Sequence, residues 1–402
     1  MSTTLTVRDF IAKNGEHYSQ LYDLSCYAFP LFYPTAYTTI MLRGMSHASQ
    51  KEHLYAIKKL HAWAASVDID IEKRLASKDF FRPAEISNMV TYLIVKQRSR
   101  LNETICKSKK TTYITVSANY LGWLAERVLT DCNAPATLKS IKRMLDAILA
   151  YKPKKGSSSR EDQRIRDSAL SDAVRLTLQF IFDNPFRTEE IPTRMGIEYR
   201  NSVALETLYE TGMRIGELLA LTLDDFQTSS GGSPATLRIV RNHDDPFDDR
   251  LSQPVAKTLG RIIGISPRLE ERIATYLKDW RSEVGRVGFR GSDFLFVTHL
   301  NGKRQGRGLT AKAFYSCLAN IKKRHVALED LHPHLLRHDW NYRFSLKAKK
   351  RKLTELQAQR EREYSMGWVY GSSSADLYNE RHIQEECYKT SMIDLNLTSR
   401  RN

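Results

Sequence analysis

Apolar residues recur at helical spacing through the first 150 residues of the chain. Three stripes have this period: Leu54, Ile57, His61 and Ala64; Val116, Tyr120, Leu124 and Val128; and Leu138, Ile141, Leu145 and Ile148. Apolar side chains three or four positions apart line one face of a helix, so each stripe predicts a helix with one buried face. We therefore predict a helical domain over residues 46–151. Residues 1–45 precede it as an N-terminal extension, either an extra helix or a separate module.

The pattern breaks at Lys152, where Pro153 and Lys154 lead into a glycine and three serines at Gly156 to Ser159. A helix breaker, small flexible residues and a run of charge are typical of a linker between domains. We predict that the linker covers residues 152–167.

The region after the linker mixes two periods. Residues 170–182 have a helical pattern, whereas Thr236 to Val240 is rich in β-branched residues, as strands are. A second strand is expected to end at Arg261 to Ile265, and the apolar run Phe294 to Val297 is either a strand or a buried helix. The rest is helical. The predicted fold is mainly α with a small antiparallel β-sheet, an α+β domain over residues 168–402 with a tail from about residue 380.

The charge of the chain favours a polyanionic partner. The sequence has 62 Lys+Arg against 46 Asp+Glu, a formal net charge of +16. Two basic clusters stand out: Lys139, Lys142 and Arg143 on the outer face of a predicted helix, and Lys349, Lys350 and Arg351 inside a longer basic run. Both are placed to meet backbone phosphates of DNA, although a solvated surface explains each of them equally well.

The five cysteines are scattered and form no C-x-x-C pair, which is typical of reduced thiols in a cytosol. We expect neither a signal peptide nor a membrane span, because no apolar stretch approaches the roughly 20 residues that a span needs. The expected location is the cytoplasm.

A first candidate site lies in Thr211 to Leu218. Thr211 and Gly212 indicate a turn before a helix, and Arg214 and Glu217 fall on nearly the same side of its first turn. The glutamate could orient the guanidinium, although an ordinary surface ion pair at this spacing explains the two residues as well.

A second candidate site lies in His334 to His338. His334 and Arg337 are three residues apart and share a helix face, and a guanidinium offers a fork that fits two phosphate oxygens. His334 can move a proton near neutral pH. The neighbouring His332 and His338 raise a metal site as the alternative, but no second cluster of ligands at the usual spacing accompanies them.

Two arginines and a histidine are what a tyrosine needs to attack a phosphodiester, because its phenol is a weak nucleophile at a free pKa of about 10. The chain has 19 tyrosines, and chemistry alone does not choose among them.

The ordered motifs resemble those of the tyrosine recombinases of the phage integrase family. Its pattern is a Thr-Gly-x-Arg-x-x-Glu-Leu box, a His-x-x-Arg-His box, a Leu-Gly-His or Gly-Trp step, and a nucleophilic tyrosine. Here these are Thr211 to Leu218, His334 to His338, Met366 to Trp368, and Tyr378, within a match over residues 168–390. The resemblance implies that Tyr378 is the nucleophile and that residues 46–151 bind the core DNA site. Tyr378 stands ten residues beyond Trp368, where nine is usual.

The resemblance also implies a lysine that protonates the leaving 5′ oxygen. Lys257 fits best, because Lys257 to Ile263 resembles the family's Lys-Thr-x-x-Arg run, and Arg241 and Arg250 are its rivals. The implied catalytic set is Arg214, Lys257, His334, Arg337, Trp368 and Tyr378, with Glu217 and His338 in support.

The resemblance implies three kinds of partner: double-stranded DNA, further copies of the chain in a homo-tetramer on two DNA sites, and accessory DNA-bending or directionality factors. It implies no metal and no other cofactor, and an origin in a bacterium or phage. Two alternatives stay open: a type IB topoisomerase, and a DNA-binding protein that keeps the fold without cutting. For residues 1–45, the resemblance leaves open whether they form an arm-site module or only an extra helix.

Overall fold

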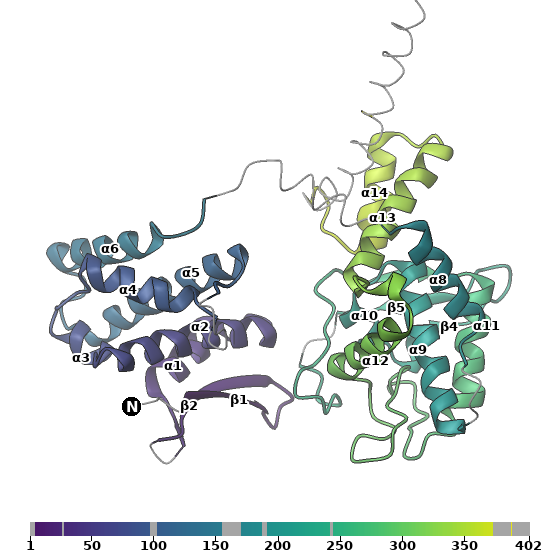
Figure 1. The fold of residues 1–402 in the computed structure, drawn as a ribbon, viewed down its shortest axis with the longest axis horizontal. Coiled ribbons are helices and arrows are strands. Elements are labelled where there is room, and N and C mark those ends of the chain that lie inside the picture. Colours follow the sequence, from purple (N-terminus) through teal and green to yellow (C-terminus); the bar gives the residue numbers. More distant parts are fainter. Residues whose placement is uncertain are drawn as a thin grey trace, which may run out of the picture. The chain divides into compact units, whose positions relative to one another are not determined.

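The computed structural model describes residues 5–25, 28–96, 103–154, 170–186, 191–241, 244–372 and 387. The chain divides into two compact units, which are taken one at a time (Figure 1). Unit 1 comprises residues 1–156 and 244–252, and unit 2 comprises residues 157–243 and 253–402. In the described ranges, no helix combines the length and the apolarity that crossing a membrane takes. The predicted linker falls mostly on residues 155–169, outside the described ranges.

Unit 1 begins with an antiparallel sheet of β1 (Leu5–Ile11), β2 (His17–Asp23) and β3 (Phe29–Pro30). The register of β1 and β2 runs from Leu5 opposite Asp23 to Ile11 opposite His17. Residues 5–30 of the predicted N-terminal extension therefore contain a sheet, and the helical part of the extension lies in residues 32–42. The turn of the hairpin contains Asn14 and Gly15, with Gly15 at φ +87°, and an Asn-Gly pair between two short strands is a strong hairpin signal.

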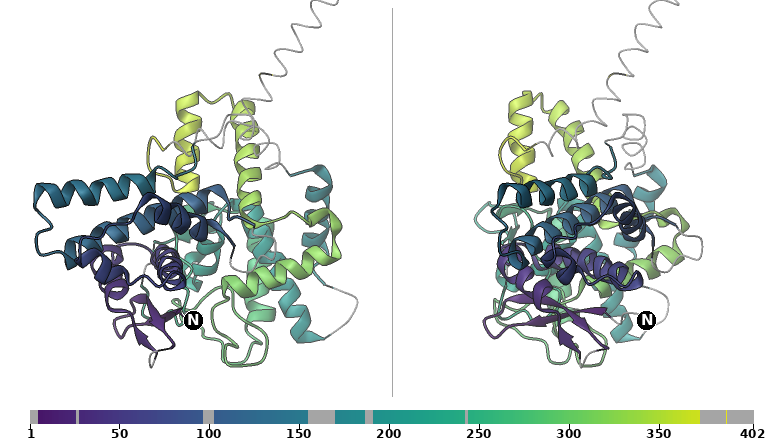
Figure 2. Two further views of the ribbon diagram at one scale, coloured as in Figure 1. Left: turned by 60° about the vertical axis from the view of Figure 1, so that its left-hand side comes forward. Right: turned by 90° about the vertical axis from the view of Figure 1, so that its left-hand side faces the viewer.

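The helices of unit 1 are α1 (Phe32–Tyr37), the π-helical η1 (Thr38–Leu42), α2 (His47–Ser66), α3 (Ile71–Ala76), α4 (Pro83–Ile94), α5 (Lys107–Val128) and α6 (Pro135–Leu149). The sheet packs against α2 (Figure 2). The predicted stripes face the shared core, except that Leu138 is 46% exposed on α6. Lys59 is buried and donates to the carbonyl oxygen of Leu93 at 2.9 Å, which satisfies the C-terminus of α4.

Unit 2 contains the helices α8 (Asp172–Asp183), α9 (Pro192–Thr211), α10 (Ile215–Ala220), α11 (Pro267–Thr275), α12 (Ala311–Arg324), α13 (Pro333–Lys350) and α14 (Glu355–Met366), and the short helices η2 (Leu223–Asp225), η3 (Tyr276–Arg281) and η4 (Val326–Leu328). Its sheet has the order β4 (Phe226–Gln227), β5 (Thr236–Ile239) and β6 (Arg261–Gly264), all antiparallel. Unit 2 thus has the predicted mainly helical fold with one small antiparallel sheet, whereas the sheet of β1, β2 and β3 in unit 1 was not predicted.

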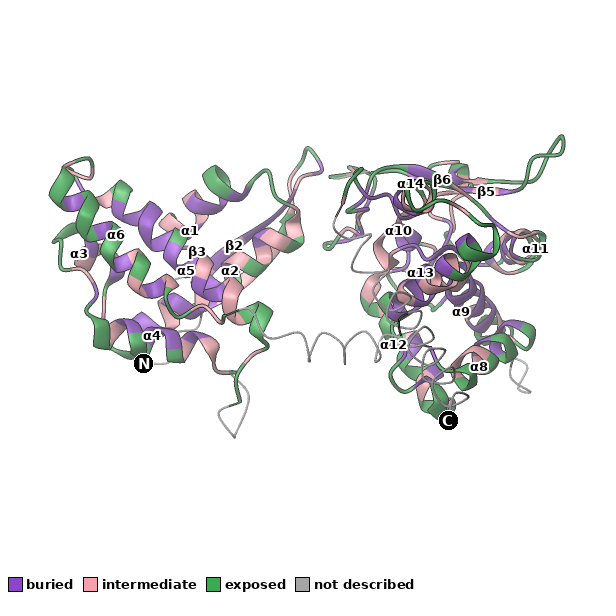
Figure 3. Cartoon of the chain, turned by 90° about the horizontal axis from the view of Figure 1, so that it is seen from above, coloured by how far each residue is buried: buried purple, intermediate pink, exposed green. Residues whose placement is uncertain are grey.

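The centre of unit 2 is α9, which is buried along most of its length (Figure 3). Most of its apolar side chains, among them Val203 and Leu208, are buried in the core. Helix α13 packs on α9, so the two segments that contain the predicted motifs lie at one place in the core.

The run Phe294 to Val297 is neither strand nor helix. It is a buried irregular segment, in which the N–H of Leu295 donates to the carbonyl oxygen of Leu221 at 2.8 Å. The N–H of Leu309 in turn donates to the carbonyl oxygen of Phe296 at 2.9 Å. These hydrogen bonds go to single residues on two different segments, and they satisfy the buried backbone groups without a regular β-ladder. The apolar pattern of the sequence therefore did not indicate that the segment is irregular.

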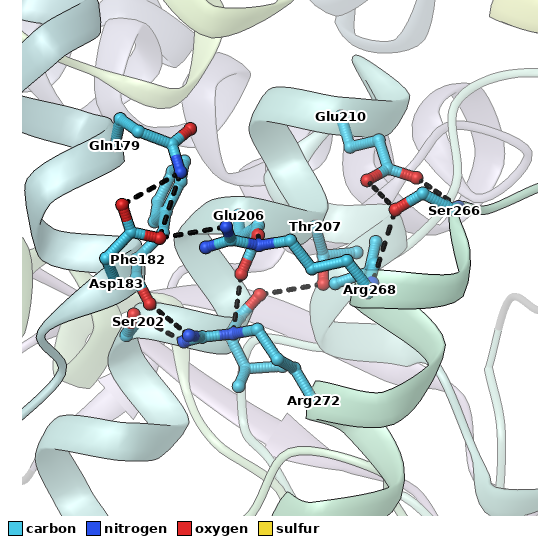
Figure 4. A network of polar contacts seen from close by, with 12 residues as sticks. Gln179, Phe182, Asp183, Ser202, Glu206, Thr207, Glu210, Ser266, Arg268 and Arg272 are labelled. Atoms are coloured by element: carbon cyan, nitrogen blue, oxygen red, sulfur yellow. Dashed lines mark hydrogen bonds and ion pairs between the residues drawn. The ribbon is translucent and has the colours of Figure 1, made fainter.

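A polar network ties α8, α9 and α11 together (Figure 4). Glu206 on α9 forms ion pairs with Arg268 at 2.8 Å and with Arg272 at 2.6 Å, both from α11. Glu210 accepts from the backbone N–H and the hydroxyl of Ser266 at 2.6 and 2.7 Å. Since Ser266 follows β6 by two residues, this network fixes the far end of the strand that follows the predicted catalytic lysine.

Candidate active site

Arg214 lies in the tight connection between α9 and α10. Gly212 ends α9 with φ +65°, and a Cβ atom there would lie 2.7 Å from Cγ of Trp340 on α13, so both the backbone and the space require glycine. Arg214 has an extended backbone and caps α10, where we expected it inside the first turn. Its N–H donates to Glu217 at 3.0 Å.

Glu217 is fully buried and holds several donors at once. Arg261 donates to it at 2.8 Å, the hydroxyl of Thr258 donates at 2.5 Å, and the Arg214 guanidinium is farther off at 3.7 Å. Burial alone would raise the pKa of Glu217, but hydrogen bonds and the charge of Arg261 outweigh burial and hold the pKa below its ordinary value. The main partner of this glutamate is therefore Arg261, and Nη1 of Arg214 has no hydrogen-bond partner within the described chain.

Arg337 on α13 joins the motifs in the core. Its Nη1 donates to the carbonyl oxygen of Gly212 at 2.9 Å, and its Nη2 donates to that of Met366 at 3.0 Å. The guanidinium carbon lies 5.5 Å from the ring centre of Trp368, a cation–π distance. The side chain is 1% exposed. Three segments that are far apart in the sequence thus meet at one guanidinium.

The two histidines of the second motif lie next to each other at the start of α13. The rings of His334 and His338 are edge to face, with their centres 4.7 Å apart. Desolvation by the surrounding protein lowers the pKa of His334, and the charges of Arg337 and Arg214 lower it further. Desolvation and the neighbouring His334 lower the pKa of His338 to about 4. Both imidazoles are therefore neutral near pH 7.

Trp368 follows the left-handed residue Gly367, which ends α14 with φ +64°. A Cβ atom on Gly367 would lie 2.7 Å from Nη1 of Arg261 and 2.8 Å from the carbonyl oxygen of Leu259. The glycine therefore permits close approach between the end of α14 and the segment that leads into β6. Trp368 is 7% exposed and packs beside Arg337.

Lys257 is exposed and lies in an irregular segment four residues before β6. The next residue, Thr258, donates to Glu217, and the N–H of Leu259 donates to the carbonyl oxygen of Gly367 at 2.9 Å. The backbone that follows Lys257 is thus bound to the two segments that also hold Arg214 and Trp368.

The two rivals of Lys257 differ from it in their surroundings. Arg250 belongs to unit 1, is 1% exposed and forms an ion pair with Asp248 at 2.7 Å, so its guanidinium is buried and paired. Arg241 is exposed directly after β5.

The predicted DNA-binding residues form two groups. Lys139, Lys142 and Arg143 on α6, and Lys349, Lys350 and Arg351 at the end of α13, are all exposed. Arg351 forms a two-pronged contact with Glu361 at 2.7 and 3.1 Å. Tyr378 lies outside the described residues. Within the described ranges, no cluster of three or more His, Cys, Asp or Glu is arranged to hold a metal ion.

Sequence reasoning overlooked the roles of Arg261 and Thr258, although both were part of the Lys-Thr-x-x-Arg run that pointed to Lys257. Arg261 is 44 residues from Glu217 in the sequence, so no helical or strand period relates them. The usable signal was an arginine in a strand that is otherwise apolar, because a buried arginine needs a partner.

Comparisons with known proteins agree on one family. Residues 189–348 match the phage integrase family. The tyrosine recombinase XerD of Listeria innocua serovar 6a is 28% identical over 153 residues, which are 38% of this chain and 43% of the relative. XerD of Halalkalibacterium halodurans is 30% identical over 146 residues, which are 35% of this chain and 39% of the relative. The chain thus spans less than half the length of these relatives.

Among solved structures, the XerH site-specific recombinase in a post-cleavage complex with palindromic difH substrate is 15% identical, with a TM-score of 0.40, over 79% of this chain and 86% of that chain. XerA recombinase is 16% identical, with a TM-score of 0.32, over 89% of this chain and 97% of that chain. The matched residues 189–348 include the Arg214 and Arg337 motifs, so the similarity to the phage integrase family covers the part of the chain that contains both motifs.

Proposed function

We propose that this protein is a site-specific DNA recombinase of the integrase type, which cuts and rejoins DNA through a 3′-phosphotyrosyl intermediate at Tyr378. The observation that carries the proposal is the position of Arg337, whose guanidinium holds the carbonyl oxygens of Gly212 and Met366 and stacks on Trp368. This contact gathers three of the four family motifs into one electropositive site.

The cleavage step uses these residues as follows. The phenolic oxygen of Tyr378 attacks the scissile phosphorus, a bond from oxygen to phosphorus forms, and the bond to the 5′ oxygen breaks. His334, neutral because its pKa is lowered, accepts the phenolic proton. Lys257 gives a proton to the leaving 5′ oxygen. The ester conserves the energy of the broken bond, so a partner strand's 5′ hydroxyl reverses the step and releases the tyrosine.

The arginines stabilise the charge that develops on the phosphoryl oxygens. Arg214 is the better placed for direct contact, since its side chain is 30% exposed whereas that of Arg337 is buried. Arg337 is buried and contributes its charge, while it keeps Trp368 beside the site. The indole N–H of Trp368 donates to the phosphate.

The proposed partners are double-stranded DNA and three further copies of the chain. Exchange of four strands between two DNA sites needs four nucleophiles, which makes a tetramer the expected assembly. Light scattering of the protein with and without its selected DNA measures this state. A particle that stays monomeric on DNA and relaxes supercoiled plasmid would favour the topoisomerase alternative.

The test of the proposal begins with selection of a binding duplex from a randomised pool by the wild-type protein. The selected duplex is then made with single nicks at successive positions, which trap the covalent product, and is analysed by denaturing electrophoresis. Wild type should give a covalent adduct, and Tyr378→Phe should give none. Tyr370→Phe is the matched control, because Tyr370 is an exposed tyrosine near Trp368. An adduct that persists in Tyr378→Phe, or none from wild type, would overturn the proposal.

A further inference from the structure

The segment from Val255 to Leu259, here called the lysine strap, crosses the start of α10. A Cβ atom on Gly216 would lie 2.8 Å from the carbonyl oxygen of Val255, so the strap rests directly on the first turn of this helix. Three residues later, Thr258 donates to Glu217 at 2.5 Å. Lys257 is therefore held between two points of contact with α10, although its own side chain is exposed.

The far end of the strap is bound to a different helix. The N–H of Leu259 donates to the carbonyl oxygen of Gly367 at 2.9 Å, at the C-terminus of α14. The strap thus spans the helix that follows Arg214 and the helix that precedes Trp368.

Arg261 binds all three of these elements with one guanidinium. Its Nε donates to the carbonyl oxygen of Ser365 at 2.7 Å, its Nη1 to the hydroxyl of Thr258 at 3.1 Å, and its Nη2 to Glu217 at 2.8 Å. Arg261 is 5% exposed, and its ion pair with Glu217 is fully buried. Because the guanidinium is rigid and planar, the three bonds fix the directions of their acceptors relative to one another.

The same helix end is held by Arg337 as well. Arg261 donates a hydrogen bond to the carbonyl oxygen of Ser365, and Arg337 donates one to the carbonyl oxygen of the next residue, Met366, at 3.0 Å. Carbonyl oxygens in the last turn of a helix lack partners within the helix and carry the negative end of its dipole, so two cations there are favourable. The positions of Arg261 and Arg337 are therefore coupled through two adjacent peptide groups.

We infer that Arg261 is a positioning residue for DNA cleavage, an inference that rests on the proposed function. It fixes the lysine strap so that Lys257 reaches the leaving 5′ oxygen while Arg214 contacts the phosphate and Arg337 contributes its charge. A purely structural arginine would contribute to folding alone. Arg261 instead acts on one step, the transfer of a proton from Lys257.

The test uses the selected nicked duplex in two forms, one with the ordinary 5′ oxygen and one with a bridging 5′ sulfur at the cleaved bond. Arg261→Lys keeps the charge but loses the three-way contact, and a misplacement of about 1 Å costs on the order of 100-fold in rate. The variant should therefore cleave the oxygen substrate on the order of 100-fold more slowly. Most of the loss should disappear with the sulfur substrate, because a thiolate leaves without a proton.

Two further variants separate positioning from folding. Thr258→Val preserves the Arg261–Glu217 ion pair and removes only the hydroxyl that ties the strap, so it should show a smaller loss with the same rescue by sulfur. Arg281→Lys is the matched control, because Arg281 is also a buried arginine that binds a backbone carbonyl group. It is 2% exposed, and its Nε and Nη2 donate hydrogen bonds to the carbonyl oxygen of Phe294 at 3.1 and 2.8 Å. Its substitution should lower the melting temperature and leave cleavage of folded protein unchanged.

The outcomes distinguish the two proposals. If wild type forms no adduct, the proposed function fails and this inference fails with it. If wild type forms the adduct, but Arg261→Lys and Thr258→Val cleave the oxygen substrate at the wild-type rate, the inference alone is overturned. A loss that is equally large on the sulfur substrate would also overturn it, because the defect would then not lie in proton transfer.

Discussion

Two regions of unit 2 bury a glutamate among arginines, and they differ in how completely the arginines are paired. In the network of Figure 4, Glu206 binds Arg268 and Arg272 at 2.8 and 2.6 Å, and both arginines have further partners. In the candidate active site, Glu217 binds Arg261 at 2.8 Å but lies 3.7 Å from Arg214. In the first region each arginine lies within 2.8 Å of a carboxylate oxygen, whereas in the second Arg214 stays 3.7 Å from its carboxylate.

The difference shows how similar residues serve stability in one place and ligand binding in another. Arg268 also reaches Asp183 at 2.8 Å, and Arg272 donates to the hydroxyl of Ser202 at 2.7 Å, so neither cation is left for an outside anion. At the second site, Arg261 occupies the carboxylate that would otherwise neutralise Arg214. A positively charged fork with unused N–H groups at a partly exposed position is suited to a phosphate.

The largest expected effect separates these arginines. Arg214→Ala should slow formation of the covalent adduct by about 10³-fold or more, because an arginine that stabilises charge on a transferring phosphoryl group is worth about 10³–10⁵ in rate. Arg268→Ala should lower stability and leave the adduct rate of folded protein unchanged. Single-turnover cleavage of the selected duplex and thermal unfolding measure the two effects. Equal losses of cleavage in both variants would remove the distinction between the regions.

The second effect concerns the glutamates. Glu217→Gln leaves Arg261 charged, buried and without its carboxylate, and breaking a buried pair in this way costs about 3–5 kcal/mol. Glu206→Gln should cost less, because the side chain of Arg268 is 43% exposed and water can solvate it. Urea unfolding followed by circular dichroism gives both values.

A double variant checks the physical reason. Glu217→Gln combined with Arg261→Met removes both charges, so the combined loss of stability should be smaller than the sum of the single losses. Additive losses would mean that the 2.8 Å contact contributes little and that Glu217 acts through its other donors.

The sequence predicted some residues of the candidate active site but not the contacts between them, for physical reasons. Arg214, His334 and Arg337 lie in short motifs whose internal spacing is visible in the sequence. The Arg261–Glu217 pair joins residues 44 positions apart, and the contacts of Arg337 with two backbone carbonyl groups depend on how α9 and α14 end. Neither periodicity nor charge reports such contacts, because they arise only after the core has packed.

The fold was predictable to a similar degree. Long helices such as α2 and α5 followed from their apolar stripes, because amphipathic periodicity is a strong signal over several turns. The sheet of β1 and β2 was missed although Asn14 and Gly15 indicated its turn. The segment from Phe294 to Val297 could not be predicted, since its hydrogen bonds go to two separate segments.

The third effect extends the comparison to cations of unit 1. Lys139, Lys142 and Arg143 are exposed on α6 and have no acidic partner among the described residues, so they resemble Arg214 more than Arg268 in being available to an anion. If all three contact phosphates, their replacement by alanine should reduce the slope of log affinity against log salt by about 0.9 for each. Binding of the selected duplex at several salt concentrations measures the slope. An unchanged slope would place DNA elsewhere on unit 1.

The fourth effect tests the charges around Arg214 by pH. Desolvation, Arg337 and Arg214 lower the pKa of His334, so this residue stays neutral to a lower pH than a free histidine with a pKa of about 6.5. As a proton acceptor it fails only when it is protonated, so the fall in cleavage rate on acidification should have its midpoint below pH 6.5. His334→Gln should lose this acid limb. A wild-type rate that halves at or above pH 6.5 would contradict the assigned role.

The smallest effect is expected where a basic residue already has its carboxylate. Arg351 belongs to the basic run at the end of α13, but Glu361 holds its two terminal nitrogens at 2.7 and 3.1 Å. A phosphate would have to displace this carboxylate, and an exposed pair of this kind is worth about 0–1 kcal/mol, so the gain from binding DNA is partly cancelled. Arg351→Ala should therefore change the salt slope by well under the about 0.9 expected for a full phosphate contact. Glu361→Gln should increase the slope in the protein that retains Arg351, because it frees the guanidinium. If Arg351→Ala instead lowers the slope by a full unit, pairing with a carboxylate does not decide which cations of this protein meet DNA.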